Sequence, residues 1–236
     1  MSAHRVWLDS FPDRPGTRLT IGGEEGHHAA RVRRVRPGDL LELIDGTGRL
    51  GQARVIGSVK SSRREWEVEG EVIGVERVLP VAPLLEVWSA VPKGERLEQM
   101  IDALTQVGAA GWSPLAVERS VVEPREGKIT RLSRVVREAC KQCGRAWAMS
   151  IGRGGTLRDA IQTTRRVVMA DGSGEARLAD DPRPAEVRLL IGPEGGWTDD
   201  ERAEARAAGV AIVRFGPHAM RIETAAAIAA GIMLNA

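Results

Sequence analysis

From Leu84 onwards, short apolar segments alternate with longer segments that have the periodicity of amphipathic helices. The apolar segments span residues 84–92, 111–117, 165–170, 186–192 and 211–215, and the helical ones span 93–108, 129–144, 199–209 and 224–234. Strands that alternate with helices favour a mostly parallel sheet covered by helices on both faces. The pattern therefore predicts an α/β domain over residues 78–236.

The first 77 residues follow a different pattern, in which short apolar strands are separated by glycine-rich turns. The candidate strands are RVWL (5–8), RLTI (18–21), LLELID (40–45), RLGQARVIGSV (49–59) and EWEVEGEVIGV (65–75), with a short helix expected over residues 24–35. Strands of this kind predict a small β-barrel. Two prolines in ERVLPVAP (76–83) predict a linker, so the expected domains are residues 1–77 and 78–236.

The composition is that of an ordinary globular protein, with 42% hydrophobic and 28% charged residues. No apolar run is long enough to span a membrane, and the first residues lack the apolar centre of a signal peptide. A cytoplasmic location is therefore expected. Cys140 and Cys143 have no second pair to complete a zinc site, so no metal is expected. The polar stretch 171–186 is expected to be a mobile loop.

The segment LLIGPEGGWTDDE (189–201) places a glycine-rich turn directly after an apolar strand. Ligands of open parallel sheets bind outside the carboxyl ends of the strands, so this turn is a candidate binding loop. It lacks the Gly-Lys-Ser/Thr sequence of a P-loop, and Asp199 and Asp200 would repel a phosphate. The loop therefore suits a neutral or cationic ligand held by backbone groups, although a plain turn without a ligand is the alternative.

Two further features accompany this loop. Thr198 and Glu201 have the spacing of a capping box, which predicts the start of a helix at this point. A second loop, RFGPHAMRIE (214–223), leaves the next strand and leads into a helix rich in small residues. Two loops that leave neighbouring strands in this way are expected to wall one pocket.

Arginines are concentrated in HHAARVRRVRPGD (27–39), and a further pair lies in SSRREW (61–66). Such a cluster is either a solvated helix surface or a phosphate-binding surface for nucleic acid, and both interpretations stay open. Aromatic residues make up only 3% of the chain and tyrosine is absent. Arginine would therefore have to supply much of any contact with RNA.

Five segments together carry a resemblance to a known family. They are HHAARVRRVRPGDLLELIDGTG (27–48), ERSVV (118–122), VVREACKQCGR (135–145), LLIGPEGGWTDDE (189–201) and RFGPHAMRIETAAAIA (214–229). These segments resemble the RsmE family of 16S rRNA uridine-N3 methyltransferases, which belong to the SPOUT superfamily. The last two segments are highly specific as a pair.

The resemblance implies a PUA-like RNA-binding barrel over residues 1–77 and a methyltransferase domain with a trefoil knot over residues 78–236. It implies S-adenosyl-L-methionine as cofactor, a homodimer, and methylation of N3 of a uridine near the 3′ end of 16S rRNA in the small ribosomal subunit. The implied cofactor-binding residues are Met169, Leu190, Ile191, Gly192, Pro193, Glu194, Gly195, Gly196, Phe215, Gly216, Met220 and Ile222. The implied RNA-binding residues are Arg5, His28, Arg31, Arg34 and Arg145.

The N3 of uracil carries a proton, and the negative charge that develops on the imide as this proton leaves is stabilised by a nearby cation. Arg221 is the candidate catalytic residue for this role, and a purely structural contact is the alternative. The chain departs from the family pattern at Ala103, Gln106 and His218, where the family has lysine, glutamate and arginine. Two other functions therefore stay open: another SPOUT RNA methyltransferase, acting on a ribose 2′-hydroxyl or a tRNA base, and an RNA-binding relative that has lost catalysis.

Overall fold

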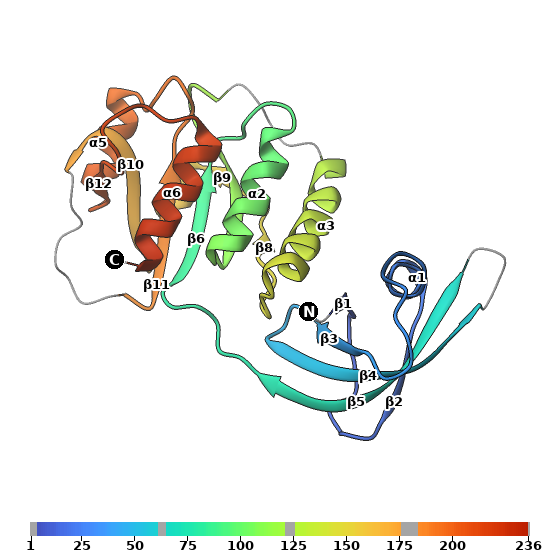
Figure 1. Ribbon diagram of the computed structural model, residues 1–236. Helices are drawn as coiled ribbons and strands as arrows, with labels where there is room; N and C mark the ends of the chain where they lie inside the picture. Colours follow the sequence, from blue (N-terminus) through green and yellow to red (C-terminus); the bar gives the residue numbers. More distant parts are fainter. Residues whose placement is uncertain (1–3, 61–64, 121–125, 176–183, 236) are drawn as a thin grey trace. The chain divides into compact units, whose positions relative to one another are not determined.

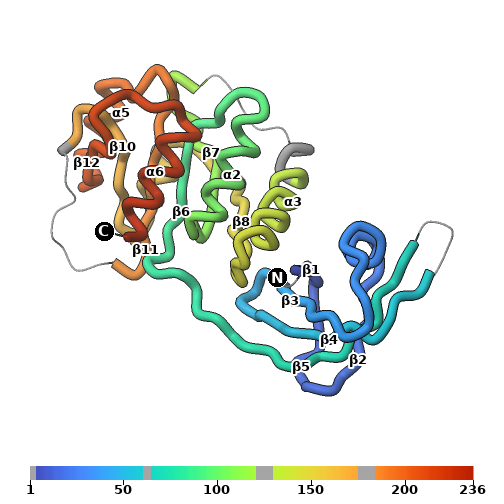
Figure 2. Tube along the Cα trace, viewed as in Figure 1, coloured from blue at the N-terminus to red at the C-terminus, as the bar shows by residue number. Residues whose placement is uncertain are grey.

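The structure is a computed structural model that describes residues 4–60, 65–120, 126–175 and 184–235 (Figures 1 and 2). The chain forms two compact units. The first unit contains Met1–Leu79 and Cys140–Ala148, and the second contains Pro80–Ala139 and Met149–Ala236. Each unit is described by itself below.

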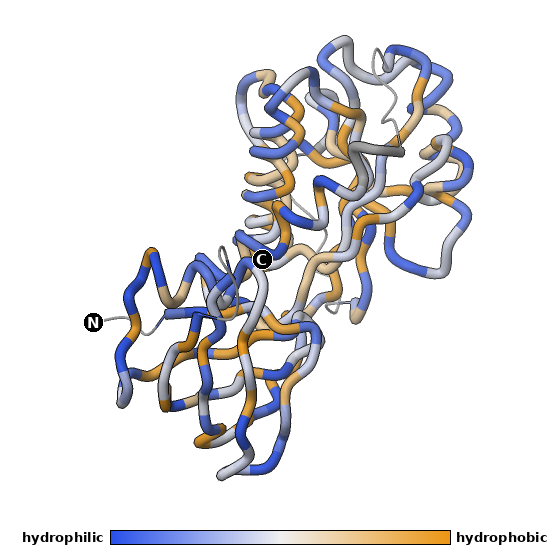
Figure 3. Tube along the Cα trace, turned by 90° about the vertical axis from the view of Figure 1, so that its right-hand side faces the viewer, coloured by the Kyte–Doolittle hydropathy of each residue, from blue (hydrophilic) through white to orange (hydrophobic). Residues whose placement is uncertain are grey.

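A five-stranded sheet forms the first unit. Its strands are β1 (His4–Trp7), β2 (Arg18–Ile21), β3 (Leu40–Ile44), β4 (Arg49–Lys60) and β5 (Trp66–Arg77), in the order β1-β3-β4-β5-β2. β1 runs parallel to β3, and the other neighbours are antiparallel. Hydrophobic and hydrophilic residues alternate along these strands, which gives the sheet one buried face (Figure 3). The five strands predicted from the sequence are confirmed.

The predicted helix over residues 24–35 is present as two short pieces. α1 (Gly23–His27) is followed without a break by the π-helical turn η1 (His28–Arg33). Arg34 ends this turn with a φ of 55°, and it is the one non-glycine residue with positive φ in the described part of the chain. The left-handed residue stops the helix and directs the chain towards β3.

Two β-bulges interrupt the long ladder between β4 and β5. Ala53 pairs with Val72 while Gln52 pairs with Gly74, so Ile73 is an extra residue on β5. Val55 pairs with Gly70 while Gly57 pairs with Glu69, so Ile56 is an extra residue on β4. Each bulge thus consists of an isoleucine followed by a glycine. A bulge bends its strand and re-aims the side chains beside it.

The segment Cys140–Ala148 packs within the first unit although it comes from the middle of the chain. Arg5 donates from Nη1 to the carbonyl oxygens of Lys141 and Gln142, each at 3.0 Å. The Nζ of Lys141 forms an ion pair of 2.6 Å with Glu25. The Trp147 Nε1–H donates to the carbonyl of Val78 at 2.7 Å. These contacts between distant parts of the sequence were not predictable from local patterns.

A parallel sheet forms the centre of the second unit. Its strands are β6 (Leu84–Ser89), β7 (Gly111–Ala116), β8 (Ser150–Ile151), β9 (Gly155–Thr156), β10 (Arg166–Glu175), β11 (Glu186–Ile191) and β12 (Ala211–Val213). The order is β12-β10-β11-β6-β7-β8, with β9 paired to β7, and every pairing is parallel. The helices are α2 (Arg96–Val107), α3 (Glu126–Cys143), α4 (Leu157–Ile161), α5 (Asp199–Ala207) and α6 (Ile222–Asn235). The predicted parallel α/β architecture is confirmed.

Helices cover both faces of this sheet. α2 packs beside α6, and α6 lies against β6 and β11 (Figure 1). The opposite face carries a core in which Met169 and Leu190 from the sheet meet Leu157 of α4 and Ala205 of α5. Because successive strand residues point to opposite faces, the fully apolar strands follow from burial on both sides.

One expectation for this unit is wrong in part. The stretch 171–186 was predicted to be a mobile loop, but β10 continues through Asp171 to Glu175, which pairs with Val213 after a register shift. Residues 176–183 of this stretch lie outside the described part of the chain. Among the described residues, none of the helices is both long enough and apolar enough to cross a membrane.

Candidate functional site

A pocket of about 280 Å³ lies where the two loops expected from the sequence meet. One loop follows β11 and the other follows β12, and both leave the carboxyl ends of strands that flank β10. The predicted residues that line the pocket are Ile191, Gly192, Pro193, Glu194, Gly196, Phe215, Gly216 and Met220. Most of the predicted site is therefore brought together around one cavity.

The remaining predicted residues lie outside this lining. The side chains of Met169 and Leu190 are fully buried in the core beneath α4 and α5. Ile222 is buried at the first position of α6, and Gly195 is exposed. Arg221 is exposed immediately before α6, where its carbonyl accepts a hydrogen bond from the backbone N–H of Ala225 at 2.8 Å.

Trp197 also lines the pocket, and the sequence analysis did not predict it as a site residue. A Cβ atom on Gly192 would lie only 2.8 Å from the indole, so the glycine allows the ring to pack directly beneath the loop. The Trp197 Nε1–H donates to the carbonyl of Ala170 at 2.9 Å, which ties the loop after β11 to the end of β10. The signal was present in the sequence, because the tryptophan directly follows the glycine-rich turn.

Arg202 fixes the same region from α5. Its Nη1 donates to the carbonyl of Trp197 at 2.8 Å and lies 3.4 Å from a carboxylate oxygen of Asp171, a pocket residue that is largely buried. Its Nη2 pairs with Asp199 at 2.6 Å. The hydrogen bond to Asp199, followed by the charge of Asp171, raises the pKa of Arg202, and the same bond lowers the pKa of Asp199. The arginine therefore stays charged and holds three segments of the site together.

The predicted capping box at Thr198 and Glu201 is confirmed, and it has a second role. The Thr198 hydroxyl accepts from the backbone N–H of Glu201, while Glu201 Oε2 accepts from the backbone N–H of Thr198. Glu201 Oε1 accepts from the backbone N–H of Glu118 at 2.9 Å. The neighbouring Arg119 donates to the carbonyl of Gly195 at 2.6 Å. Glu118 and Arg119, the first two residues of the segment ERSVV, thus hold the glycine-rich loop and the start of α5 in place.

Small residues of α6 complete the pocket. Ala225 and Ala229 line it from one side of the helix, four residues apart and therefore on the same helical face. The sequence indicated a helix rich in small residues after the second loop, and the structure places part of that helix at the pocket. Arg96, at the start of α2, lies 4.0 Å from Glu194 of the pocket and 4.0 Å from Glu223 of α6.

The lining combines apolar walls with backbone groups and few charges. Asp171 and Glu194 carry negative charge, Arg214 carries positive charge, and His218 lies beside them. The described residues contain no group of three or more histidine, cysteine or acidic side chains placed to hold a metal ion. Such a pocket matches an uncharged or cationic organic ligand better than a polyphosphate.

The predicted RNA-binding residues lie in the first unit. Arg31 is exposed, with its guanidinium 5.4 Å from the centre of the Trp66 ring, and Arg34 is exposed at the end of η1. Arg5 pairs with Glu42 at 2.6 Å in addition to its bonds with two backbone carbonyls, so most of its donors are engaged within the unit. Arg145 is partly buried, and burial lowers its pKa.

His28 lies beside His4, with 5.2 Å between the ring centroids. The Nδ1 atom of His28 and the Nε2 atom of His4 are both buried without a hydrogen-bond partner among the described residues. Burial lowers the pKa of His4 from 6.5 to about 4, and the charges of His28, Arg33 and Lys141 act in the same direction. His4 is therefore neutral at neutral pH.

Comparison with known proteins finds relatives over nearly the whole chain. A family model described as an RNA methyltransferase domain matches residues 79–234, and one described as an RNA methyltransferase PUA domain matches residues 21–61. The ribosomal RNA small subunit methyltransferase E of Mycobacterium bovis is 33% identical over 246 residues, which cover 98% of this chain and 91% of that protein. The protein of the same name from Synechocystis is 29% identical and covers 89% of this chain and 71% of its own length.

Solved structures show the same fold. A putative methyltransferase from Legionella pneumophila, solved with the bound cofactor SAM, matches all of this chain and 98% of its own with a TM-score of 0.85 and 26% identity. The family models and the curated relatives together cover both units. The chain therefore belongs to the family of RNA methyltransferases that includes the ribosomal RNA small subunit methyltransferases E.

Proposed function

We propose that this protein uses S-adenosyl-L-methionine to methylate N3 of a uridine near the 3′ end of 16S rRNA in the small ribosomal subunit. The observation that carries the proposal is the pocket between the loops that follow β11 and β12, in a chain of the RNA methyltransferase family. The proposed cofactor matches the one named for the structural relative from Legionella pneumophila.

The residues of the pocket fit this cofactor. S-adenosyl-L-methionine carries a sulfonium cation and no phosphate, and the described lining holds the carboxylates of Asp171 and Glu194 beside one arginine, Arg214. The loop 191–196 supplies backbone N–H and C=O groups, and Ala225 and Ala229 leave room beside them. When bound, the cofactor supplies the methyl group. The protein then contributes mainly position, because a displacement of this kind depends on alignment of donor and acceptor.

The uridine must be unpaired when it is methylated, because N3 of a paired uracil lies inside the base pair. We assign Arg221 to the stabilisation of the negative charge that develops on the uracil imide. Its exposure beside the pocket supports this role, since the side chain is accessible to RNA. The remaining predicted cofactor contacts, Met169, Leu190, Gly195 and Ile222, stay proposals, and those of Met169 and Leu190 would use backbone atoms because their side chains are in the core.

RNA binding by the first unit is assigned chiefly to Arg31 and Arg34, which are exposed, with His28 beside them. Arg5 and Arg145 remain candidates, although Arg5 is largely engaged in contacts within the unit. We further propose that residues 1–77 and 78–236 act as RNA-binding and methyltransferase domains, and that the loops of the second form a trefoil knot. A cytoplasmic location is proposed because the substrate would be ribosomal RNA.

A homodimer is also proposed. Ile228 and Ile232 on α6 are 42% and 43% exposed, and they lie one helical turn apart on the same face. Exposed apolar side chains that cluster on one helix commonly mark a surface for association. The occupant of that surface is proposed to be a second copy of this chain.

Two positions that depart from the family pattern lie away from the pocket. The Gln106 amide donates to Asp102 on the exposed side of α2, and Ala103 lies between them on the same helix. Only His218 lines the pocket. This placement favours a retained activity over a relative that has lost catalysis.

The test is methylation of small ribosomal subunits with a labelled methyl donor, followed by mapping of the modified nucleotide by mass spectrometry. A methyl group on N3 of a single uridine near the 3′ end of 16S rRNA supports the proposal. Label on a ribose 2′-hydroxyl, or on tRNA alone, assigns the protein to another SPOUT activity. Cofactor binding by calorimetry without turnover on any RNA assigns it to the RNA-binding class.

A further inference from the structure

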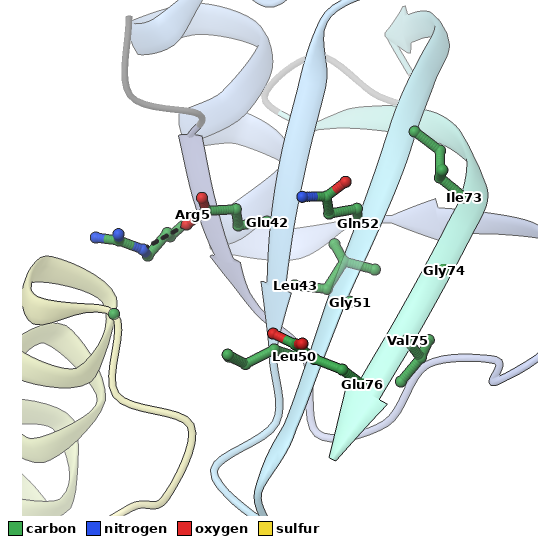
Figure 4. Close-up of a pocket in the computed structure, with 11 residues that line it drawn as sticks. Arg5, Glu42, Leu43, Leu50, Gly51, Gln52, Ile73, Gly74, Val75 and Glu76 are labelled. Carbon is green, nitrogen blue, oxygen red and sulfur yellow. Dashed lines mark hydrogen bonds and ion pairs between the residues drawn. The ribbon is translucent and has the colours of Figure 1, made fainter. Parts of the chain in front are cut away.

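A second pocket, of about 460 Å³, opens on the outward face of the sheet in the first unit (Figure 4). Arg5, Glu42, Gln52 and Gly74 are successive partners across β1, β3, β4 and β5, so they form one row on this face. In Figure 4, the side chains of Glu42 and Gln52 project from neighbouring strands, and Arg5 reaches Glu42 from the side of β1.

The hollow exists because Gly74, the last residue of this row, has no side chain. A Cβ atom on Gly74 would meet no atom within 4 Å, so the backbone there is bare. The bulge at Ile73 re-aims the chain beside it, and Leu50, Ile73 and Val75 give the hollow apolar walls. A glycine inside a strand that borders such a space is a position where a ligand can approach the backbone closely.

The polar groups of this pocket are only partly used by the protein. Arg5 neutralises Glu42 through an ion pair of 2.6 Å. Within the described chain, neither the Gln52 amide nor the Glu76 carboxylate has a hydrogen-bond or ion-pair partner. The pocket therefore presents one free carboxylate, one amide that both donates and accepts, and apolar walls.

We propose that this pocket binds one unpaired RNA nucleotide, whose base carries an exocyclic amino group. The base lies over the bare backbone at Gly74, its amino group donates to Glu76, and Gln52 bonds a second atom on its edge. A carboxylate that accepts from an amino group is an established means of reading a base. The inference rests on the proposed function, since it identifies the substrate of the first unit as RNA with unstacked bases.

Charge near the pocket supports RNA over a basic peptide. Arg54 lies two residues beyond Gln52 on β4, so both side chains leave the same face of the strand. It is exposed and forms no ion pair within the described chain, which leaves its guanidinium accessible to a phosphate next to the base. A lysine or arginine of a partner would instead require several converging carboxylates, whereas Glu42 is already neutralised.

The two bulges provide a matched pair of variants for the test. Gly74→Val fills the pocket, and Gly57→Val places the same side chain in open space at the other bulge, outside the pocket. Neither glycine has positive φ, so valine is compatible with both strands. Gln52→Ala removes the amide, and Arg54→Ala removes the proposed phosphate contact. The probes are four fluorescein-labelled single-stranded hexanucleotides of uridine in which one central position is A, C, G or U.

Dissociation constants are measured by fluorescence anisotropy at several salt concentrations with the full-length protein. We expect it to bind at least one of the A, C and G hexamers about tenfold more tightly than the all-uridine hexamer, a difference within the range that one good base contact provides. Gly74→Val and Gln52→Ala remove this preference and leave the salt slope unchanged, while Gly57→Val behaves as the parent protein. Arg54→Ala lowers the salt slope by about one and retains the preference.

Equal affinity of the parent protein for all four hexamers overturns the proposal, as does an unchanged preference in Gly74→Val. If an oligolysine peptide binds the parent protein but not Gly74→Val, while RNA affinities are unchanged, the pocket belongs to a protein partner and the proposal is wrong. The hexamer preference does not depend on methylation. A protein that shows the preference but leaves uridine N3 unmodified would therefore contradict the proposed reaction and not the nucleotide pocket.

Discussion

Glu201 Oε1 accepts a hydrogen bond from the backbone N–H of Glu118 at 2.9 Å, across 83 residues of sequence. The other carboxylate oxygen of Glu201 accepts from the backbone N–H of Thr198 at 2.8 Å. One buried side chain thus caps α5 and joins the loop after β7 to the loop that lines the candidate cofactor pocket. The capping signal in the sequence revealed only the first of these roles.

We expect Glu201→Ala to lower the free energy of unfolding by about 3 kcal/mol, because two backbone N–H groups lose a charged acceptor in a largely buried place. Urea denaturation followed by circular dichroism measures this. The matched control is Asp159→Ala, which removes the corresponding carboxylate from the exposed capping box of α4, where its hydrogen bonds within the described residues are all to Thr156. Similar losses in both variants would show that the bond to Glu118 adds nothing.

Gly192→Ala should weaken cofactor binding and lower the melting temperature by several degrees. Its Cβ would lie 2.8 Å from the Trp197 indole, so the ring or the loop must move. Gly172→Ala is the control, because Gly172 also lines the pocket but its Cβ would meet nothing within 4 Å. Calorimetry with S-adenosyl-L-methionine and thermal unfolding read the two effects. Unchanged affinity in a folded Gly192→Ala protein would place the cofactor elsewhere.

Arg221→Ala should fold, bind S-adenosyl-L-methionine within about threefold of the parent, and lose about 3 kcal/mol of transition-state stabilisation. The reason is that a cation near the acceptor acts only as negative charge develops. Single-turnover methylation separates this effect from binding. Lysine at this position should rescue the rate only in part, because it lacks the planar fork of arginine. A parental rate in the alanine variant would make Arg221 a structural residue.

We expect a double variant with Ile228→Glu and Ile232→Glu to be a monomer of 25.5 kDa, and we expect the parent protein to be a dimer at micromolar concentration. Charged side chains in place of two exposed isoleucines would remove apolar area from the proposed contact and leave the fold intact. Val59→Glu, at a 56% exposed position of β4, serves as control. Light scattering gives the mass, and a monomeric parent protein would exclude the dimer.

Because of His4, we expect the free energy of unfolding to decrease as the pH falls from about 6.5 to about 4. Its pKa is about 4 in the folded chain and 6.5 in the unfolded one, so the unfolded state binds the extra proton within this window. The contribution is complete above pH 6.5, and we expect a loss of about 1–2 kcal/mol after allowance for solvent screening. His4→Gln should flatten the corresponding part of the profile. Identical profiles for both proteins would contradict the assigned pKa.

The sequence predicted the architecture of the second unit because its signals are local. Apolar strands, amphipathic helices and the capping box at Thr198 are each specified by residues that lie close together in the sequence. The same is true of the glycine-rich loop, since parallel strands bring their carboxyl ends to one edge whatever their order. The resemblance to a known family then supplied the identity of the ligand, which local patterns do not contain.

What the sequence did not reveal depends on contacts between distant residues. The packing of Cys140–Ala148 in the first unit depends on bonds from Arg5 and Lys141 to partners more than 100 residues away. The pocket beside β4 and β5 depends on a register shift that places Gly74 opposite Gln52. A strand pattern indicates which residues alternate, but it does not indicate where the pairing slips by one residue.

α6 carries two adjoining pairs of residues with different proposed occupants. Ala225 and Ala229 border the candidate cofactor pocket, and Ile228 and Ile232, each three residues further along the helix, are exposed to the proposed second copy. A displacement of this helix would alter both contacts together. If such a displacement accompanies either event, occupancy of the pocket and pairing of copies are linked, and thermodynamic reciprocity requires each to change the free energy of the other by the same amount. The affinity for the methyl donor would then depend on protein concentration, and α6 would be the element that transmits cooperativity between two active sites.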